Sequence, residues 1–533
     1  MSGFPLKNTF PWSLLIGALV ILATFLNSER SELDLFFISD ALYLPSIYQD
    51  IFRDGGHLAE WSLNPAPNFF PDMGLYFLLN WVFGDLRWAQ YVFPIVQFLL
   101  MAVLFRGVVL RVAPDMGEVP ITLGVLLLVL VILTGWWGGD MGFAFHLLIN
   151  SFHGGAFVNA LLCSLLLLRA YDRRGKGPVV VLVLAIAAAS VSDKLFWIMF
   201  TLPATVVCAT LAVRSPARSR LALLAVVVLS TTVLSHKLLV FIDSKLPLQF
   251  EAPYAYLAFE RVPFSWGRFV DSLGFYLRGA PLVAGTIVLG LVATVWAVVV
   301  AVRWAINWWR MPRVMHTPAS DRMGMALGLM ALFFPFVLLA PVANGSFDGI
   351  DSFRYNFAVF ALAPLVAGVV IGRRLRLSGR WVVVAGLLGI GIPAFWICAV
   401  SGRDDYHRIG SYKPEVVADF DRLTASWGLR NGVANYWVAK RITLFSEQPV
   451  MVLPVYPDVA MYVHVNRPAM YFDKEFDFAI VHPELTRETL VHVFQQDTGF
   501  HGLGEVEVLL THPWTFDPER NGVPRITPPA SAP

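Results

Sequence analysis

The sequence predicts a polytopic α-helical membrane protein with about eleven transmembrane helices, followed by a small α/β domain outside the membrane. Of the 533 residues, 57% are hydrophobic and 15% are charged, whereas about a quarter of the residues are charged in a typical soluble domain. Eleven apolar stretches approach or reach the roughly 20 residues that a helix needs to cross a bilayer. They lie at 11–27, 87–105, 119–136, 143–169, 178–192, 195–213, 221–242, 281–303, 323–342, 353–373 and 381–400.

The distribution of arginine and lysine predicts the orientation of these helices. A further apolar stretch, 74–83, has about ten residues, which is half the length needed to cross. When it is not counted as a span, five basic clusters fall on one side of the membrane, as the positive-inside rule requires. They are Arg106 with Arg111, 169–176, 214–220, 303–322 and 373–380. The N-terminus is then cytoplasmic, the C-terminus is outside, and 69–84 is expected to lie in the membrane interface as a juxtamembrane helix.

The same pattern predicts the domain organisation. A transmembrane domain covers 1–400 and includes a long first outer loop at 28–86. An extracytoplasmic α/β domain covers 401–515, because 413–427 has helical spacing and short β-rich segments follow it. These expected strands lie at 449–455, 460–465 and 476–481. The end of the chain, 516–533, is rich in Pro, Ser and Ala and is expected to be disordered.

Several function classes find no support in the sequence. The formal net charge is +2, so no strong overall field indicates a nucleic-acid partner. The three cysteines, Cys163, Cys208 and Cys398, fall inside predicted spans without a Cys-x-x-Cys pattern, so neither a disulfide framework nor a thiolate metal site is indicated. There is no Walker sequence, no usable Gly-x-Gly-x-x-Gly and no serine nucleophile elbow.

Two aspartates in the first outer loop are the candidate catalytic acids. Asp40 follows the first span closely, and Asp72 precedes the apolar stretch at 74–83. A carboxylate at a desolvated rim has a raised proton affinity and can accept a proton from an attacking hydroxyl. The alternative is that both are ordinary solvated acids of an acidic loop.

Four cationic residues near the predicted outer ends of the spans are candidates for binding a phosphate. They are Lys194, His236, Lys237 and Arg354. Cations at that depth could bind a lipid-linked phosphate, and the planar guanidinium of Arg354 suits a fork-like grip. Each residue also has a simpler explanation, since Lys194 could snorkel or pair with Asp193, and Arg354 could pair with Asp351.

A polar stripe is predicted near the outer end of the 143–169 helix. His146, Asn150 and His153 are spaced i, i+4 and i+7, which places them on one helix face, and Asp140 lies just before them. These residues could line a polar cavity that orients a sugar, or with the acids hold a divalent cation. Two histidines seven residues apart are weak evidence for a metal, and hydrogen bonding between helices is the alternative.

The layout resembles the C-type (GT-C superfold) glycosyltransferases that use polyprenyl-phosphate sugars, such as protein mannosyltransferases and the aminoarabinose transferase of lipid A. The shared pattern is a first span, a long outer loop with an early aspartate (here in Ser39-Asp40-Ala-Leu-Tyr), and an amphipathic stretch that runs from Pro71 to Gly84. Many spans and an outer α/β domain follow. The stretches 436–440 and 443–446 also resemble segments of bacterial members.

The resemblance implies a function and a location. Asp40 matches the family's first-loop acid, which acts as a base or positions the acceptor. Two departures are that Ala41 stands where a second acid is usual, and that Asn68-Phe-Phe-Pro-Asp-Met replaces His/Lys-Pro-Pro-Leu. The implied protein lies in the bacterial inner (plasma) membrane, with its C-terminal domain in the periplasm.

The sequence-based hypothesis is therefore an integral-membrane glycosyltransferase. It would move a sugar from a polyprenyl-phosphate carrier to an acceptor glycan, lipid or protein on the extracytoplasmic face. Its partners would be that donor, the acceptor and membrane lipid, without nucleic acid. The alternatives are a transporter or flippase of a lipid-linked or anionic solute, and a non-catalytic membrane scaffold. A transporter would be favoured by polar residues near the middle of the membrane and by two repeated halves of the chain. Neither pattern is visible in the sequence.

Overall fold

The computed structural model describes residues 8–137, 147–173, 175–244, 249–250, 258–312, 315–375, 377–472, 474–495, 499–517 and 523–526. The chain divides into two compact units. The first, called here the helical unit, comprises Met1–Asn27, Ala66–Val240 and Pro253–Tyr406. The second, called here the sheet unit, comprises Ser28–Pro65, Phe241–Ala252 and His407–Pro533. The first outer loop is therefore shared between both units, whereas the sequence assigns all of it to the transmembrane domain.

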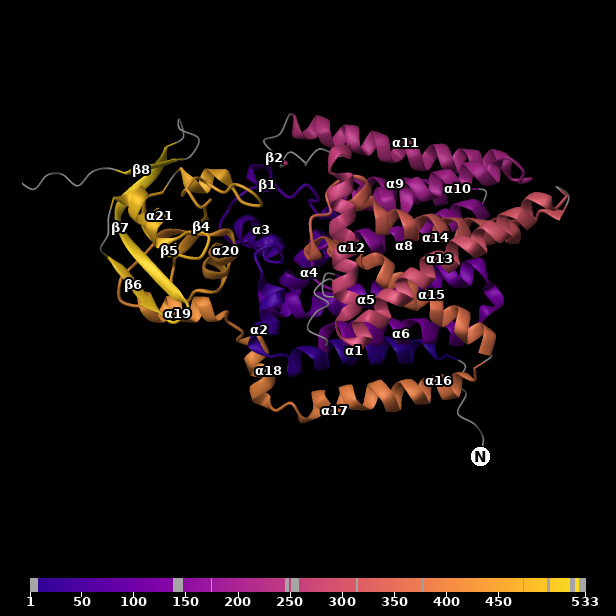
Figure 1. Cartoon of the computed structure of the whole chain (residues 1–533), viewed down its shortest axis with the longest axis horizontal. Coiled ribbons are helices and arrows are strands. Elements are labelled where there is room, and N and C mark those ends of the chain that lie inside the picture. The colour runs from indigo at the N-terminus through magenta and orange to yellow at the C-terminus, as the bar shows by residue number, and fades with distance from the viewer. Residues whose placement is uncertain are drawn as a thin grey trace, which may run out of the picture. The chain divides into compact units, whose positions relative to one another are not determined.

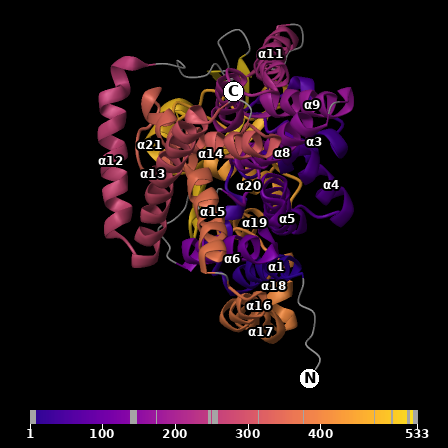
Figure 2. The same ribbon diagram turned by 90° about the vertical axis from the view of Figure 1, so that its right-hand side faces the viewer.

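Long apolar helices make up most of the helical unit (Figures 1 and 2). They are α1 (Phe10–Asn27), α4 (Gly74–Phe83), α5 (Leu86–Val112), α6 (Glu118–Trp137), α8 (Gly154–Asp172), α9 (Lys176–Ser192), α10 (Leu202–Ala212), α11 (Arg218–Asp243), α12 (Val262–Arg278), α13 (Pro281–Arg310), α14 (Pro318–Ala343), α15 (Phe357–Leu375), α16 (Gly379–Gly386) and α17 (Ile392–Val400). Helix α18 (Arg403–Gly410) crosses the boundary between the units.

Eight helices in the described part of the chain are long and apolar enough to cross a membrane, whereas the sequence predicts eleven. Three more apolar helical segments are shorter within the described residues: Glu118–Leu133, which is part of α6, Lys176–Ser192, which is α9, and Trp197–Ala212, which ends in α10. The counts differ because the sequence count includes stretches well below 20 residues, such as 178–192, and because α6 is described only in part. The prediction that several helices can span a membrane is supported by their length and composition. The orientation of the chain stays a prediction.

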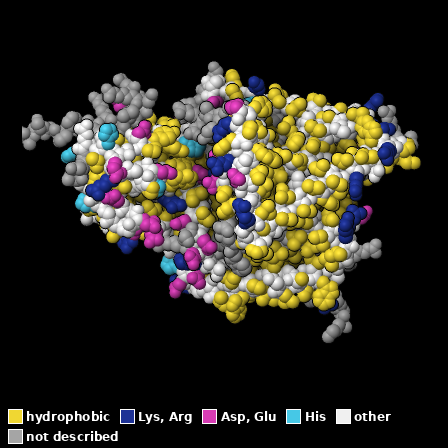
Figure 3. All heavy atoms as spheres, in the orientation of Figure 1, with side chains coloured by type: hydrophobic (Ala, Val, Ile, Leu, Met, Phe, Trp, Pro, Cys, Tyr) yellow, Lys and Arg dark blue, Asp and Glu magenta, His cyan; other side chains and the backbone are white. Residues whose placement is uncertain are grey.

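Exposed apolar side chains on the helical unit agree with a lipid-facing surface. Hydrophobic side chains cover most of the face of this unit that Figure 3 shows. Leu234 on α11 is 67% exposed and Leu282 on α13 is 66% exposed. In water such a surface would be costly, because apolar area is driven out of contact with water. Helix α4, at the predicted juxtamembrane position, likewise exposes Trp81 and Val82.

Glycines allow two helices of this unit to approach closely. Gly124 on α6 faces Gly368 on α15, and a Cβ added at Gly368 would lie 2.3 Å from the Cα of Gly124. A Cβ at Gly372 would lie 2.7 Å from the Cα of Pro120. Small residues at such crossings let helix backbones pack tightly in the absence of a hydrophobic driving force.

The sheet unit contains a mixed sheet covered by short helices. The strand order is β4 (Met451–Pro454), β3 (Asn431–Ala434), β5 (Phe476–Val481), β7 (Val506–Asp517) and β6 (Phe500–Leu503), and β8 (Val523–Ile526) pairs with β7. Strands β4, β3 and β5 are parallel, and β7 runs antiparallel to β5. The remaining elements include α2 (Arg30–Leu33), α3 (Tyr43–Phe52), β1 (Ser62–Leu63), β2 (Gln249–Phe250), α19 (Glu415–Thr424), α20 (Tyr436–Phe445) and α21 (Arg487–Phe494).

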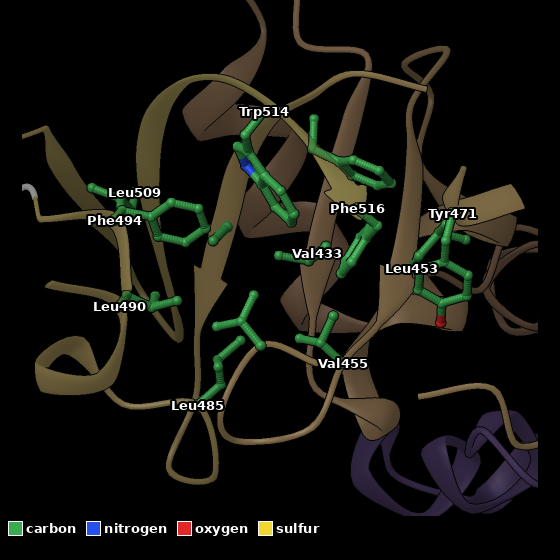
Figure 4. Close-up of a cluster of buried hydrophobic side chains, with 13 residues drawn as sticks. Val433, Leu453, Val455, Tyr471, Leu485, Leu490, Phe494, Leu509, Trp514 and Phe516 are labelled. Atoms are coloured by element: carbon green, nitrogen blue, oxygen red, sulfur yellow. The ribbon is translucent and has the colours of Figure 1, made fainter. Parts of the chain in front are cut away.

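The core of this sheet combines aromatic and aliphatic side chains. Trp514 and Phe516 from β7 pack with Tyr471, Phe494 and Val433 (Figure 4). The expected strands at 449–455 and 476–481 correspond to β4 and β5, whereas 460–465 forms only an isolated bridge at Met461. The helix expected at 413–427 corresponds to α19. Strand β8 lies inside the tail that the sequence predicts to be disordered, and its pairing with β7 explains its order.

Charged and polar contacts fix the first-loop residues within the sheet unit. Asp50 is buried, and it accepts a hydrogen bond from Trp61 Nε1 at 2.7 Å and pairs with Arg467 Nη1 at 3.2 Å. Arg467 also contacts Glu60 at 2.5 Å. A buried acid without such a partner would be strongly destabilising. The need to pair the buried Asp50 with Arg467 explains why residues 28–65 pack with the C-terminal residues of the same unit.

Candidate functional site

The segment that carries Asp72 is fixed by hydrogen bonds between its backbone and residues of α8 and α9. The amide of Asn68 donates to the carbonyl of Ser192 at 3.0 Å, and the amide of Phe70 donates to the Ser192 hydroxyl at 2.9 Å. The side-chain amide of Asn159 donates to the Phe70 carbonyl at 2.9 Å. The Asp72 carboxyl is therefore placed against the beginning of α8.

Asp72 is a buried acid with one oxygen available. Its side chain is 1% exposed, and its Oδ2 accepts a hydrogen bond from the amide of Ser151 at 3.1 Å. Its Oδ1 has no hydrogen-bond partner in the described part of the chain. Burial raises the pKa of Asp72 to about 7; the Ser151 amide opposes this shift, and the negative charge of Asp193 adds to it. The carboxyl can therefore gain or lose a proton near neutral pH.

His153 lies beside this acid and is oriented by a second carboxylate. Its Nδ1 is 2.6 Å from Asp193 Oδ2, and Asp193 Oδ1 accepts a hydrogen bond from the amide of Leu195 at 2.9 Å. The ring also packs on Tyr355, with 5.4 Å between centroids. When Nδ1 donates to Asp193, Nε2 is left as the proton acceptor of the ring. Two carboxyls and an imidazole thus meet at the start of α8.

The predicted cationic residues gather in the same unit. The His236 ring packs edge-on against Trp197, with 5.2 Å between centroids, and both Lys194 and Lys237 lie within electrostatic reach of His236. Lys194 directly follows Asp193 in the chain.

Arg354 reaches the histidine through an aromatic neighbour. Its Nη2 donates to the Tyr355 hydroxyl at 3.2 Å, and its guanidinium carbon is 5.2 Å from the centre of that ring. Tyr355 in turn packs on His153. The alternative that Arg354 pairs with Asp351 stays a prediction.

The predicted polar stripe differs from the structure. Asp140 and His146 lie outside the described residues, and the expected helix begins only at Gly154. Asn150 and His153 lie in turns, and His153 has a φ of 64°, so the i, i+4, i+7 helical face is wrong. Asn150 is buried and donates to Gln90, and it accepts from the Ser151 hydroxyl at 3.0 Å. The turn is favoured because it directs the Ser151 amide to Asp72.

Asp40 belongs to the sheet unit and has a different environment. It lies in a turn before α3, and its Oδ1 accepts a hydrogen bond from the Tyr436 hydroxyl. Ser39 donates to the Tyr436 carbonyl at 2.6 Å, and Asp40 acts electrostatically on Lys440 and His464. Asp72, Lys194 and Arg354 are in the helical unit. A joint site of Asp40 with these residues therefore stays a prediction.

An apolar cavity lies between α5, α8, α14 and α15. Its volume is about 260 Å³, and its described lining is mostly apolar, with Ser164, Trp296 and Arg373 contributing polar atoms. Along α8 it extends from Phe157 to Leu168, which is about 16 Å at 1.5 Å per residue. The end of the cavity at Phe157 lies close to His153, because the Phe157 amide donates a hydrogen bond to the His153 carbonyl in the first turn of α8. The cavity has the length and lining expected for a lipid chain.

Two other acids of the helical unit, Asp172 and Asp321, also have partners. Asp172 contacts Arg111 at 2.6 Å and Arg322 at 2.9 Å, and Asp321 accepts hydrogen bonds from Tyr171 and Ser215 at 2.6 and 2.5 Å. These groups stabilise helix packing at the ends of α8 and α14 that lie away from Asp72. Asp321 also keeps one oxygen, Oδ1, without a hydrogen-bond partner among the described residues, but Asp72 differs from it in lying beside His153.

Sequence reasoning overlooked Asp193, Ser151 and Tyr355 as site residues. Asp193 was visible as an acid at the end of a helix rich in small residues, but only as a partner for Lys194. Ser151 contributes through its backbone amide and Tyr355 through its ring, so neither has a sequence signal. Among the residues that the structure describes, no group of three or more His, Cys, Asp or Glu side chains is arranged to hold a metal ion.

The fold and the site define a polytopic helical membrane protein with a buried carboxylate–histidine centre next to an apolar cavity. Comparisons with protein-family models, curated proteins and solved structures give no match to this chain.

Proposed function

We propose that this protein is an integral-membrane glycosyltransferase that takes its sugar from a polyprenyl-phosphate carrier. The observation that carries the proposal is the buried Asp72 carboxyl, with one oxygen that accepts no hydrogen bond from any described residue and a pKa near 7. The His153–Asp193 pair and the cationic residues of the same unit complete the set of groups that such a transfer requires. The resemblance of the layout to GT-C enzymes agrees with this assignment.

In the proposed reaction Asp72 is the general base. Its Oδ1 takes the proton of the acceptor hydroxyl while the acceptor oxygen forms a bond to the anomeric carbon of the sugar. The bond between that carbon and the phosphate oxygen breaks, and its electron pair leaves with the carrier. A base with a pKa close to the working pH combines adequate ionisation with adequate proton affinity. The His153–Asp193 pair positions the acceptor and can relay the proton to solvent.

The leaving group gains negative charge in this step. The carrier changes from a phosphodiester with one charge to a phosphomonoester with two when fully ionised. Lys194, Lys237 and Arg354 are proposed to stabilise this charge, and the His236 ring can donate a hydrogen bond to it. Fixed cations that face developing charge are among the largest contributions to such catalysis. Arg354 is held against Tyr355, and the ring of Tyr355 packs on His153.

The apolar cavity is proposed to hold part of the polyprenyl chain. Its wall on α8 starts one turn after His153, so the chain would extend from the reaction centre into the helical unit. The orientation predicted from the basic clusters places the reaction centre on the extracytoplasmic side. In this proposal all eleven apolar helices contribute to the membrane domain, and the three shorter ones are accommodated within the bundle.

The test is sugar transfer by purified full-length protein. Undecaprenyl phosphate carrying radiolabelled mannose, glucose or aminoarabinose is supplied, and both transfer to membrane acceptors and release of free carrier are measured. We expect Asp72→Asn to lower the rate about 10²- to 10⁴-fold, the usual contribution of a general base. Asp115→Asn, which changes an exposed acid in the loop between α5 and α6, is the matched control and should retain full activity.

Asp40→Asn distinguishes the two candidate acids. We expect it to lower transfer much less than Asp72→Asn, because Asp40 belongs to the sheet unit, whereas Asp72 shares the helical unit with His153, Lys194 and Arg354. The opposite ranking would assign the base to Asp40 and remove Asp72 from that role. If none of the three donors is consumed by the wild-type protein, the glycosyltransferase proposal fails for them.

A further inference from the structure

The parallel strands of the sheet unit create a favourable place for a ligand. The chain passes from β3 to β4 on one side and then returns to β5 on the other side of β3. In sheets of this kind ligands bind beyond the carboxyl ends of the strands, where the strand order reverses. A ligand of this sheet would therefore bind at the loops after β3, β4 and β5.

These loops bring a group of aromatic side chains together, called here the aromatic edge. Tyr436 and Trp437 follow β3, and Tyr456, Tyr462 and His464 follow β4. The Tyr462 ring is 4.7 Å from that of Tyr456, 5.1 Å from that of Tyr436 and 5.9 Å from that of His464. Trp437 is 41% exposed and Tyr456 is 44% exposed. Large aromatic faces are thus open to solvent at this edge.

The framework around the aromatic edge is rigid. The Tyr471 hydroxyl, in the core, lies 2.6 Å from the carbonyl oxygen of Pro454 and 2.8 Å from that of Tyr462. The side-chain amide of Asn435, after β3, is 2.8 Å from Nδ1 of His482, after β5. The three loops are therefore fixed both to the core and to one another.

A buried lysine lies beneath the aromatic edge. The Lys440 side chain is 5% exposed, and its Nζ, 5.2 Å from the centre of the Tyr436 ring, has no hydrogen-bond partner in the described part of the chain. Asp40 and His464 are the ionisable groups that act on it electrostatically. Burial lowers the pKa of Lys440 to about 7, and Asp40 opposes the shift. A buried amine that lacks a partner is costly, and a bound hydroxyl group would satisfy it.

We propose that the aromatic edge, with Asp40 and Lys440, is a saccharide-binding site. A sugar ring presents flat C–H faces that pack on exposed aromatic rings, and its hydroxyls pair with carboxylate, amine and imidazole groups. One acid and one amine give little net charge, which suits a neutral polyol better than a polyanion. The proposal goes beyond the transfer reaction, because it assigns ligand recognition to the sheet unit independently of where the chemistry occurs.

The experiment measures oligosaccharide binding by the full-length protein without any donor. The protein is kept in a detergent that has no sugar headgroup, and the probes are trisaccharides of mannose, glucose, galactose and arabinose, followed by saturation-transfer NMR. We expect at least one trisaccharide to bind. Trp437→Ala and Tyr456→Ala should each weaken that binding about tenfold, the effect of losing one stacked ring. Trp437→Phe should restore it to within about threefold.

The matched control is Trp427→Ala, which removes a partly exposed tryptophan that packs on His501 elsewhere in the same unit. It should bind as the wild type does. The proposal is overturned if no trisaccharide binds the wild-type protein, or if Trp437→Ala and Tyr456→Ala both bind as tightly as the wild type. Since no donor is present, failure here would leave the transfer proposal intact, and loss of transfer would leave this binding site intact.

Discussion

Asp72 of the helical unit and Asp40 of the sheet unit are two acids from the same predicted outer loop with opposite environments. Asp72 is buried, has one oxygen without a described hydrogen-bond donor, and has a pKa raised to about 7 by burial. Asp40 is partly exposed and accepts a hydrogen bond from Tyr436. The difference teaches that proximity to a membrane span does not by itself make an acid a base. The surrounding side chains decide whether an oxygen is available for a proton.

Among changes that keep the Asp72 carboxyl, the largest effect is expected from moving it. In Gly155→Ala the new Cβ would lie 2.1 Å from Asp72 Oδ1 and 2.9 Å from Pro71 Cδ, so the carboxyl must shift. We expect sugar transfer to fall about 10²-fold, because misplacement of a catalytic group by about 1 Å has that consequence. Gly177→Ala, at a helix position with open space around it, should leave the rate unchanged. Full activity of Gly155→Ala would argue against Asp72.

The second effect is on the pH dependence of transfer. Burial raises the pKa of Asp72 to about 7, so its ionised, proton-accepting form increases with pH. We expect kcat/KM to fall about tenfold per pH unit below 7 and to level off above it. The donor is a phosphodiester whose charge is constant over this range, so it does not contribute to the profile.

Asp40→Asn serves as the control in the pH experiment, and its profile should have the same midpoint as the wild type. A profile that is flat between pH 5 and 8 in the wild type would contradict the assignment of Asp72. If the midpoint of the Asp40→Asn profile differs from that of the wild type, the role of general base would instead belong to Asp40.

The smallest effect is expected from Tyr436→Phe in the sheet unit. This change removes the hydroxyl that donates to Asp40 but keeps the aromatic ring. We expect the free energy of unfolding to fall by about 1 kcal/mol, the net value of a typical hydrogen bond, and transfer to change less than threefold. Thermal unfolding and the transfer assay measure the two quantities. A loss of transfer comparable to that of Gly155→Ala would show that Asp40 takes part in the reaction.

Sequence patterns predicted the general class of the fold because hydrophobicity is a local property of the chain. The apolar stretches correspond to helices in the structure, and α19, β4 and β5 follow the periodicities expected of them. Helix ends were less predictable, as the start of α8 at Gly154 shows. There the backbone forms a turn that directs the Ser151 amide to Asp72, a contact across 79 residues that no local pattern encodes.

The sequence by itself determined that this chain is rich in membrane-length helices, that its C-terminal part contains a sheet, and that Asp40, Asp72, Lys194 and Arg354 are residues to consider. The tertiary structure alone decided the division of the first loop between two units, the pairing of His153 with Asp193, and the aromatic edge around Tyr462. The physical reason is that hydrophobic periodicity depends on near neighbours. Proton affinity and ligand recognition depend on which distant residues exclude water from a group and which offer it a hydrogen bond.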